Sequence, residues 1–375
     1  MSDVKAPLRV MSIVGARPNF MKVAPIIEAI RASEAPIEHM LVHTGQHYDE
    51  KMSQSFFVDL GMPEPDLNLG VGSGSQADQT GRIMMAIEQP ILDFRPDVLI
   101  VVGDVNSTMA CAITARKLGV LVAHVEAGLR SRDMTMPEEI NRLCTDAITD
   151  IFFTADRISN ENLRAEGVPA EKIHFIGNVM IDTLMRHRAL AENLTTGEDL
   201  GFKRGHYGVL TLHRPANVDT AAKLGEILDA ILDATGNLPI IFPAHPRTIA
   251  SLDRFGLRDR VSAKAGQPGI HLVEPLGYLQ FLNLTSGAKL IMTDSGGLQE
   301  ESTVLQVPCV TIRDNTERPI TIEEGTNILA GTTGDGIRDA IRKSGWKSMV
   351  ESRIPEKWDG KSAERIVSVL GGLRD

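Results

Sequence analysis

Carboxylates follow several apolar runs of the chain, where they are placed to exchange protons with a bound substrate. Asp104 ends the run DVLIVVGD, Glu126 ends VLVAHVEAG, and Glu138 follows Pro137 at an expected helix start. Carboxylates crowded into a partly desolvated site can hold different protonation states near neutral pH, as acid–base catalysis requires. A helix N-terminus also favours a negative side chain, so Glu138 has a structural interpretation as well. We interpret these three residues as candidates for acid–base chemistry.

Basic residues and a glycine-rich turn suit an anionic ligand. Arg17 and Lys22 lie in GARPNFMK, directly after the first apolar run. The stretch TDSGGLQEES follows the apolar run KLIM and opens a helix-like segment, in which backbone N–H groups of Ser295, Gly296 and Gly297 can approach a pyrophosphate. An ordinary strand–helix turn, with Ser295 as the helix cap, fits the same residues.

Two histidines end apolar runs in the second half of the chain. His213 and Arg214 lie in TLHRPANVD, and His245 lies in FPAHPRT. A lone histidine at such a position is more often a hydrogen-bonded structural group. His213 beside Arg214 is nevertheless a credible donor to a phosphate or a sugar.

The sequence does not favour metal binding or thiol chemistry. His43 and His47 are spaced by four in HTGQH, but the glycine between them favours a loop over the helix that a metal pair would need. Cys111, Cys144 and Cys309 lie far apart in apolar surroundings and match no metal-ligand spacing. We therefore predict buried structural thiols and no bound metal.

Short β-branched runs alternate with helix-patterned segments along the whole chain. The runs are LRVMSIVG, EHMLVHTG, DVLIVVGD, LVAHVEAG, DIFFTA, KIHFIGN, GVLTLH, PIIFPAHP, IHLVEP, KLIMTDSGG, PCVTIRD and TNILAG. Continuous apolar strands separated by helices are typical of parallel sheets covered on both faces, and two such sets indicate two doubly wound α/β domains. Because ligands bind beyond the carboxyl ends of such strands, we expect the residues named above to line one interdomain cleft.

Two other segments are expected to be connections. The polar segment from Met185 to Gly208 has several helix breakers and is the expected link between the domains. The glycine-rich VGSGSQ, residues 71–76, follows no apolar run and is expected to form a connection or a lid.

Composition and missing motifs exclude several classes of protein. The 375 residues suffice for two cores, and the net charge of −10 disfavours a sequence-independent nucleic-acid binder. No apolar run reaches the roughly 18–20 residues that span a bilayer, and no signal peptide is evident, so we predict a cytoplasmic protein without a membrane partner. The first strand lacks both the G-x-G-x-x-G and the G-x-x-x-x-G-K-[ST] patterns, which disfavours a Rossmann dehydrogenase or a P-loop kinase.

Taken together, the motifs resemble those of the non-hydrolysing UDP-N-acetylglucosamine 2-epimerases over nearly the whole chain. The matching segments are GARPNFMK, VGDVNST, HVEAGLRS, MPEEINR, GNVMIDT, TLHRPANVD, TDSGGLQEE and TERPITIEEGTN. The resemblance implies twin Rossmann-like domains as in GT-B glycosyltransferases, with residues 1–184 and 185–358 as domains and 359–375 as a helix packing back on the first. It further implies a UDP-sugar substrate inverted at carbon 2, usually a homodimer, and neither NAD nor an obligatory metal as cofactor.

The resemblance also implies roles for individual residues. Asp104, Glu126 and Glu138 match the catalytic acidic positions, and His213 would lie near the diphosphate. We expect Arg130 and Arg142 to orient Glu126 and Glu138. The expected substrate-binding residues are Arg17, Lys22, Arg142, Arg214, His245, Ser295, Gly296, Gly297, Glu301 and Arg318, of which Glu301 matches the position that holds the ribose hydroxyls.

Some positions depart from the family pattern. Asn19 and Ala216 stand where many members have glutamate. Gln46 and His47 match the activator-binding Gln-His-Arg-Gln run of many bacterial members, but Tyr48 and Asp49 replace its last two residues, which disfavours allosteric activation. The alternatives left open are a 2-epimerase of UDP-2,3-diacetamido-2,3-dideoxyglucuronate, a hydrolysing 2-epimerase, a glycosyltransferase of the same architecture and a catalytically silent UDP-sugar sensor.

Overall fold

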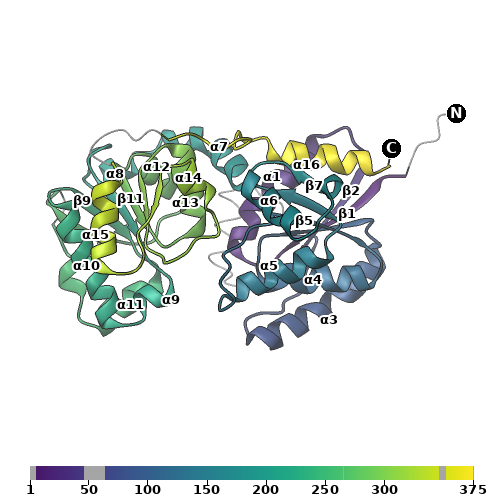
Figure 1. Cartoon of the computed structure of the whole chain (residues 1–375), viewed down its shortest axis with the longest axis horizontal. Helices are drawn as coiled ribbons and strands as arrows, with labels where there is room; N and C mark the ends of the chain where they lie inside the picture. Colours follow the sequence, from purple (N-terminus) through teal and green to yellow (C-terminus); the bar gives the residue numbers. More distant parts are fainter. Residues whose placement is uncertain (1–5, 46–63, 265, 346–351, 375) are drawn as a thin grey trace. The chain divides into compact units, whose positions relative to one another are not determined.

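The computed structural model describes residues 6–45, 64–264, 266–345 and 352–374 (Figure 1). The chain divides into two compact units, Met1–Met185 with Glu356–Asp375, and Arg186–Pro355. It passes from the first unit to the second within helix α7 (Val179–Glu192) and returns after Pro355.

The first unit is built on a parallel sheet, seven-stranded within the described residues. Its strands are β1 (Leu8–Val14), β2 (Ile37–His43), β3 (Leu67–Asn68), β4 (Val98–Val102), β5 (Leu121–Val125), β6 (Ile151–Thr154) and β7 (Ile173–Phe175). The spatial order is β3-β2-β1-β4-β5-β6-β7, so β1 pairs with β2 on one side and with β4 on the other. This reversal of direction creates a switch point, beyond which open α/β sheets bind their ligands.

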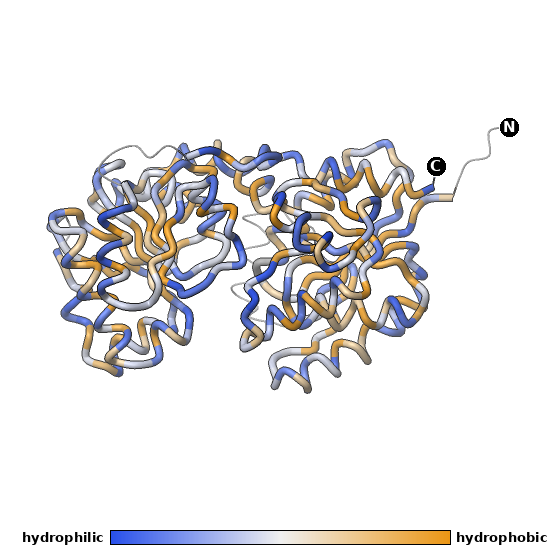
Figure 2. Tube along the Cα trace, in the orientation of Figure 1, coloured by the Kyte–Doolittle hydropathy of each residue, from blue (hydrophilic) through white to orange (hydrophobic). Residues whose placement is uncertain are grey.

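Helices cover this sheet and bury its apolar residues. They are α1 (Arg17–Ala32), α3 (Gln76–Phe94), α4 (Asn106–Lys117), α5 (Pro137–Ile148), α6 (Arg157–Ala165), α7 and α16 (Ser362–Gly371). Helix α3 buries Ile83, Ile87 and Ile91, which recur every four residues on one face and pack into the core. The chain trace is hydrophobic along the strands within each unit (Figure 2).

The last helix packs back on the first unit. Helix α16 lies against α1, and Asp182 of α7 accepts hydrogen bonds from the first backbone N–H groups of α16, those of Ser362 at 3.1 Å and Ala363 at 2.7 Å. Just before this helix, the indole N–H of Trp358 donates to the Ala155 carbonyl at 2.9 Å. The two bonds to Asp182 satisfy backbone donors that the N-terminus of α16 would otherwise leave unpaired.

The second unit repeats the plan with a parallel sheet, which has six strands in the part of the unit that the structure describes. Its strands are β8 (Gly208–Thr211), β9 (Pro239–Pro243), β10 (Gly269–Val273), β11 (Leu290–Thr293), β12 (Cys309–Thr311) and β13 (Asn327–Leu329). Its helices are α8 (Thr196–Asp199), α9 (Pro215–Val218), α10 (Ala221–Thr235), α11 (Pro246–Arg254), α12 (Tyr278–Ser286), α13 (Gly296–Leu305), α14 (Ile320–Glu323) and α15 (Gly334–Lys343). The order β10-β9-β8-β11-β12-β13 places the switch point between β8 and β11.

The predicted fold class is confirmed, since all twelve predicted runs form strands of two doubly wound parallel sheets. The expected link from Met185 to Gly208 begins where the chain passes from the first unit to the second, and it holds the second half of α7 and all of α8. One expectation about connections is wrong, because the glycine-rich residues 71–76 do follow a strand, the two-residue β3. Within the described residues, no helix is long and apolar enough to cross a membrane.

Candidate active site

The turn after β4 brings the chain close to a buried cation. Gly103 has φ +69°, and a Cβ added there would lie 3.2 Å from Nζ of Lys22 and 3.6 Å from Oε2 of Glu126. Asn19 of α1 donates from Nδ2 to the Val102 carbonyl at 2.9 Å, and its Oδ1 accepts from the Ala16 N–H at 3.0 Å. Asn19 thereby ties the start of α1 to the end of β4, a role the sequence did not reveal.

Glu126 and Lys22 form a buried ion pair. Oε2 of Glu126 accepts from Nζ of Lys22 at 2.6 Å, and the side chains are only 4% and 8% exposed. Glu126 has φ +71°, a left-handed backbone conformation that is unfavourable for a residue with a side chain. Within the part of the chain that the structure describes, its Oε1 has no hydrogen-bond partner. The turn after β5 thus holds one carboxylate oxygen in an ion pair and a second that is buried without a hydrogen-bond partner among the described residues.

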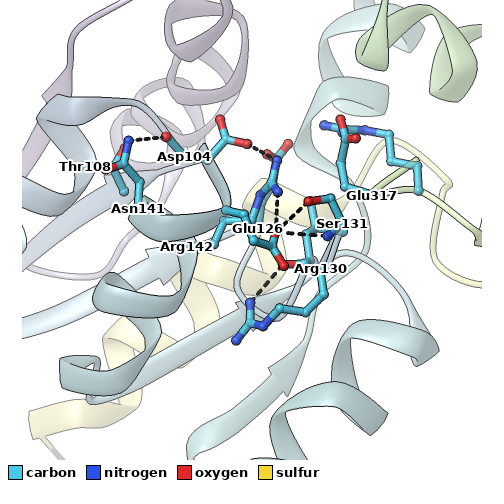
Figure 3. A network of polar contacts seen from close by, with 12 residues as sticks. Asp104, Thr108, Glu126, Arg130, Ser131, Asn141, Arg142 and Glu317 are labelled. Atoms are coloured by element: carbon cyan, nitrogen blue, oxygen red, sulfur yellow. Dashed lines mark hydrogen bonds and ion pairs between the residues drawn. The ribbon is translucent and has the colours of Figure 1, made fainter. Parts of the chain in front are cut away.

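Arg142 of α5 joins the carboxylate of Asp104, which follows β4, to a carboxylate on its own helix (Figure 3). Its Nη2 lies 2.5 Å from Oδ2 of Asp104, and its Nη1 lies 2.7 Å from Oε2 of Glu139. Glu139 also accepts the backbone N–H groups of Ser131 at 2.9 Å and Arg132 at 2.8 Å. Burial alone would raise the pKa of Glu139, but these hydrogen bonds and the Arg142 charge hold that pKa below its usual value.

A second side chain of α5 supports the Asp104 turn. Asn141 donates from Nδ2 to the Asp104 carbonyl at 2.8 Å and to Oδ1 of Asn106 at 3.2 Å (Figure 3). Helix α5 therefore holds Asp104 through both its side chain and its backbone. Glu138 is exposed beside the helix start at Pro137, whereas its neighbour Glu139 is buried.

One expectation for this loop is wrong. Arg130 does not contact Glu126 or Glu138, because its guanidinium binds Oδ2 of Asp146 at 2.7 Å and both oxygens of Glu166, at 2.8 and 2.6 Å. Arg142 binds Asp104 and Glu139, as described above. Glu139 and Asp146 are thus structural carboxylates that the motif reading missed. The i,i+3 spacing of Glu139 and Arg142 on one helix was the available signal.

In the second unit, a fully buried carboxylate organises the residues after β8. Oδ1 of Asp294 lies 2.8 Å from Nδ1 of His213, whose side chain is 48% exposed. Asp294 also accepts the backbone N–H groups of His213 and Arg214 and, at 3.1 Å, Nδ2 of Asn217. Burial tends to raise the pKa of Asp294, yet these donors hold it below its usual value. His213 is thus held by one ring nitrogen, with part of its side chain open to a ligand.

The glycine turn after β11 begins helix α13. Ser295 occupies the N-cap position but makes no side-chain capping hydrogen bond, so the interpretation of its hydroxyl as the helix cap is wrong. A Cβ added to Gly296 would lie 3.1 Å from Nη1 of Arg318. Arg318 is in turn held by Glu300 at 2.7 Å and Glu317 at 2.5 Å. A helix N-terminus beside an oriented guanidinium favours an anion.

The remaining predicted site residues fall into different environments. Glu301 of α13 is buried, which raises its pKa to about 8, with the charge of Glu300 acting in the same direction. His245 is the exposed N-cap of α11 and accepts the Arg247 N–H at 3.2 Å, as its structural interpretation requires. Arg17 is the first residue of α1, but its side chain lies outside the described structure.

The cysteines and the remaining histidines agree only partly with the environments predicted for them. Cys111 and Cys309 are buried as predicted, whereas Cys144 is exposed on α5, so its prediction is wrong. His43 is buried at the end of β2, and His47 lies outside the described residues together with Gln46, Tyr48 and Asp49. Among the residues that the structure describes, no three His, Cys, Asp or Glu side chains are grouped to hold a metal ion.

These features define a class of protein. Each unit is a doubly wound α/β fold with polar side chains at the carboxyl ends of its central strands. The first unit offers two carboxylates, Asp104 and Glu126, each paired with a cation. The second offers a partly exposed histidine and a helix N-terminus suited to an anion. This combination belongs to enzymes that move protons on an anionic, phosphate-bearing substrate.

Comparison with known proteins gives the family. A sequence profile described as UDP-N-acetylglucosamine 2-epimerase matches residues 28–371. A UDP-N-acetylglucosamine 2-epimerase of Methanocaldococcus jannaschii is 41% identical over 373 residues, which cover 97% of this chain and 99% of the relative. A UDP-2,3-diacetamido-2,3-dideoxy-D-glucuronate 2-epimerase of Pseudomonas aeruginosa is 39% identical, with 98% and 100% covered.

A solved structure agrees with this assignment. The crystal structure of Methanocaldococcus jannaschii UDP-GlcNAc 2-epimerase in complex with UDP-GlcNAc and UDP matches with a TM-score of 0.85 and 41% identity, covering 97% of this chain and 99% of that one. The chain therefore belongs to the UDP-N-acetylglucosamine 2-epimerase family. The resemblance inferred from its motifs is confirmed, and the protein is an epimerase.

Proposed function

We propose that the enzyme interconverts UDP-GlcNAc and UDP-ManNAc by inverting carbon 2. The observation that carries this proposal is the pair of cation-bound carboxylates, Asp104 and Glu126, on adjacent strand ends of a chain that is 41% identical to a UDP-N-acetylglucosamine 2-epimerase. Adjacent strands β4 and β5 run parallel, so their carboxyl ends meet at one edge of the sheet. Two proton-transfer groups at one edge suit an inversion at a single carbon.

The chemistry requires the bond to UDP to break. The proton on carbon 2 is too weakly acidic for simple removal, so we propose that a base takes it while UDP departs from carbon 1, leaving 2-acetamidoglucal. UDP then adds back to carbon 1 as a proton arrives at carbon 2 on the opposite face. Asp104, Glu126 and Glu138 are the proposed proton-transfer and sugar-orienting residues, and Lys22 and Arg142 hold the first two of these carboxylates in place.

The departing diphosphate needs positive charge. We assign this role to the N-terminus of α13, with Ser295, Gly296 and Gly297, and to Arg318 beside Gly296. The residues proposed to assist are Arg17, Arg214, His213 and His245, with Glu301 as the ribose-binding group. His213 suits stabilisation of the leaving diphosphate, because Asp294 fixes one ring nitrogen and nearly half of the side chain remains exposed.

Proton NMR in deuterated water tests this function. UDP-GlcNAc incubated with the enzyme, without added metal or NAD, should yield UDP-ManNAc carrying deuterium at carbon 2. Accumulation of UDP and free N-acetylmannosamine would instead indicate the hydrolysing reaction. Retention of the carbon 2 proton in both sugars would contradict the proposed proton exchange. Release of UDP that depends on an added acceptor would indicate glycosyl transfer.

A related substrate is the second candidate. The Pseudomonas aeruginosa relative, named as an epimerase of UDP-2,3-diacetamido-2,3-dideoxy-D-glucuronate, is 39% identical over nearly the whole chain, close to the 41% of the UDP-GlcNAc epimerase. The same experiment with this uronate nucleotide distinguishes the two. Deuterium incorporation into the uronate alone would favour the second candidate.

Assembly and location are further proposals. We propose a homodimer that uses neither NAD nor an obligatory metal, because the family resemblance implies these properties. We also propose that the enzyme works in the cytoplasm, as expected from its sequence. Light scattering coupled to size exclusion should give about twice the mass of one chain. A monomer that retains full turnover would overturn the dimer.

A further inference from the structure

A fully buried histidine lies behind the two catalytic turns. His124 belongs to β5, and its ring is 0% exposed. Its Nδ1 lies 2.6 Å from Oδ1 of Asp146 on α5, and its Nε2 lies 2.9 Å from the Gly103 carbonyl oxygen. Gly103 directly precedes Asp104. A single ring therefore connects helix α5 to the turn that carries a proposed proton-transfer residue.

The hydrogen-bond partners decide the protonation of this ring. A carbonyl oxygen can only accept, so Nε2 must donate to Gly103. Asp146 already accepts the Gly128 N–H at 3.0 Å and an ion pair from Arg130 at 2.7 Å, which favours its ionised form, so Nδ1 must donate as well. Both ring nitrogens then carry protons, and His124 is an imidazolium.

The surrounding charges make a buried cation tolerable. His124 and Arg130 are the cations, and Asp146 and Glu166 are the anions; Arg130 bridges the two carboxylates. Buried charges persist when they are paired and hydrogen-bonded, as His124, Arg130 and Asp146 are here, while Glu166 is 40% exposed.

The network fixes two turns at once. Asp146 holds the turn after β5 through Gly128 N–H and Arg130, and this turn includes Glu126 in its left-handed conformation. Through His124 it also holds Gly103, which has φ +69°. We propose that His124, as a buried imidazolium between Asp146 and Gly103, is a positioning residue that aims Asp104 for proton transfer. The inference rests on the proposed catalytic role of Asp104.

Two isosteric substitutions separate positioning from general packing. The amide nitrogen of asparagine occupies the place of histidine Nδ1, and that of glutamine the place of Nε2. His124→Asn therefore keeps the donor to Asp146 and loses the donor to Gly103, whereas His124→Gln does the reverse. Both remove a buried charge partner, so both should destabilise the fold to a similar extent, as urea unfolding will show.

Only the asparagine variant should lose turnover strongly. Releasing the Gly103 carbonyl misplaces Asp104, and a misplacement near 1 Å costs about 100-fold in kcat. The glutamine variant should keep kcat within about 10-fold of the wild type, since it keeps the donor to Gly103. Affinity for UDP should be unchanged in both, because the proposed UDP-binding groups lie in the second unit, except Arg17, which belongs to α1 and to neither of the two turns. Equal kcat in the two variants would overturn the positioning role.

Nitrogen NMR of the wild type tests the charge directly. With histidine labelled with ¹⁵N, both ring nitrogens of His124 should show the shifts of protonated imidazolium at pH 7, and the His124→Gln spectrum assigns the signal. A neutral tautomer would overturn the inference. The Asp104→Asn variant separates failure of the proposed function from failure of the His124 inference. Full turnover in Asp104→Asn would remove the proposed catalytic role of Asp104. An inactive Asp104→Asn together with a fully active His124→Asn would remove only the positioning role of His124.

Discussion

Nζ of Lys22 lies 2.6 Å from Oε2 of Glu126, and both side chains are more than nine-tenths buried. The two residues are 104 positions apart and come from different elements, α1 and the turn after β5. A buried ion pair of this kind contributes little net stability, because desolvation offsets the attraction, but removing one partner leaves an uncompensated charge. The position of this ion pair beside Gly103 fits a catalytic purpose better than a stabilising one.

Replacing Lys22 by methionine should destabilise the fold by about 3–5 kcal/mol, because it leaves Glu126 buried without a counter-ion. Urea unfolding measures this change. The double variant Lys22→Met/Glu126→Gln should recover most of the lost stability while remaining inactive, since the carboxylate is gone. Recovery of turnover in the double variant would show that Glu126 has no chemical role.

Replacing Arg142 by lysine should lower kcat by about 100-fold, because one ammonium cannot reproduce the planar bridge between Asp104 and Glu139. The dissociation constant of UDP, measured by calorimetry, should stay the same. Arg338→Lys, in a partly exposed ion pair between Arg338 of α15 and Asp233, is the matched control and should leave both values unchanged. A weakened UDP affinity with an unaltered kcat would contradict the role of Arg142 at Asp104.

The strands were predictable from the sequence because parallel strands covered on both faces read as uninterrupted apolar runs. Strand β3 was not predicted, because its two residues, Leu67 and Asn68, are too few to form a recognisable pattern. The candidate site was predictable where polar residues directly follow such runs, as Asp104 and His213 do. Motif position alone did not reveal which neighbour is buried, and thus missed Glu139 beside Glu138.

The hydrogen-bond partners that are distant in the sequence could not be predicted. Asp294 pairs with His213 across 81 positions, and Asp146 pairs with His124 across 22. No local rule connects residues so far apart. One signal was present, however, since a histidine inside the apolar run LVAHV requires a polar partner in the core.

Replacing Asp294 by asparagine should cost about 1–3 kcal/mol of stability, because the amide group cannot accept the donors that now meet the carboxylate. The loss should shrink as pH falls. The depressed pKa of Asp294 contributes stability that is present above its unfolded value near 3.8 and disappears as the folded carboxylate becomes protonated. Turnover of the Asp294→Asn variant should also fall, because His213 loses its orientation. His213→Gln should show a similar loss of turnover. Thermal unfolding between pH 3 and 7 and steady-state kinetics provide the two measurements.

Replacing Glu301 by glutamine should stabilise the free enzyme at high pH. Burial raises the pKa of Glu301 to about 8, so the folded state favours the neutral acid. The stability that Glu301 contributes is fully present at pH values below its unfolded-state pKa, near 4.5. This contribution is lost as the pH rises from about 4.5 to 8, by at most about 1.4 kcal/mol per pH unit. The gap in melting temperature between variant and wild type should therefore widen from pH 5 to 8. A constant gap would show that Glu301 is ionised throughout.

Glu138 and Glu139 are neighbours with opposite environments, and their glutamine variants should separate chemistry from structure. Glu138→Gln changes an exposed side chain, so stability should stay within about 0.5 kcal/mol. Its kcat should fall about 100-fold or more if Glu138 transfers a proton. Glu139→Gln weakens the buried bonds to Arg142, Ser131 and Arg132 and should cost about 1–3 kcal/mol.

The pH dependence of the two variants gives an independent check. Because the pKa of Glu139 is depressed, the stability that it contributes is present above its usual value near 4.5 and is lost at lower pH. The difference between wild type and Glu139→Gln should therefore narrow as pH falls below 4.5, while Glu138→Gln should track the wild type throughout. Deuterium incorporation at carbon 2 then decides the chemistry. If Glu138→Gln exchanges that proton at the wild-type rate, the carboxylate that motif position assigned to catalysis is a surface charge, and Asp104 and Glu126 alone must account for both faces of the sugar.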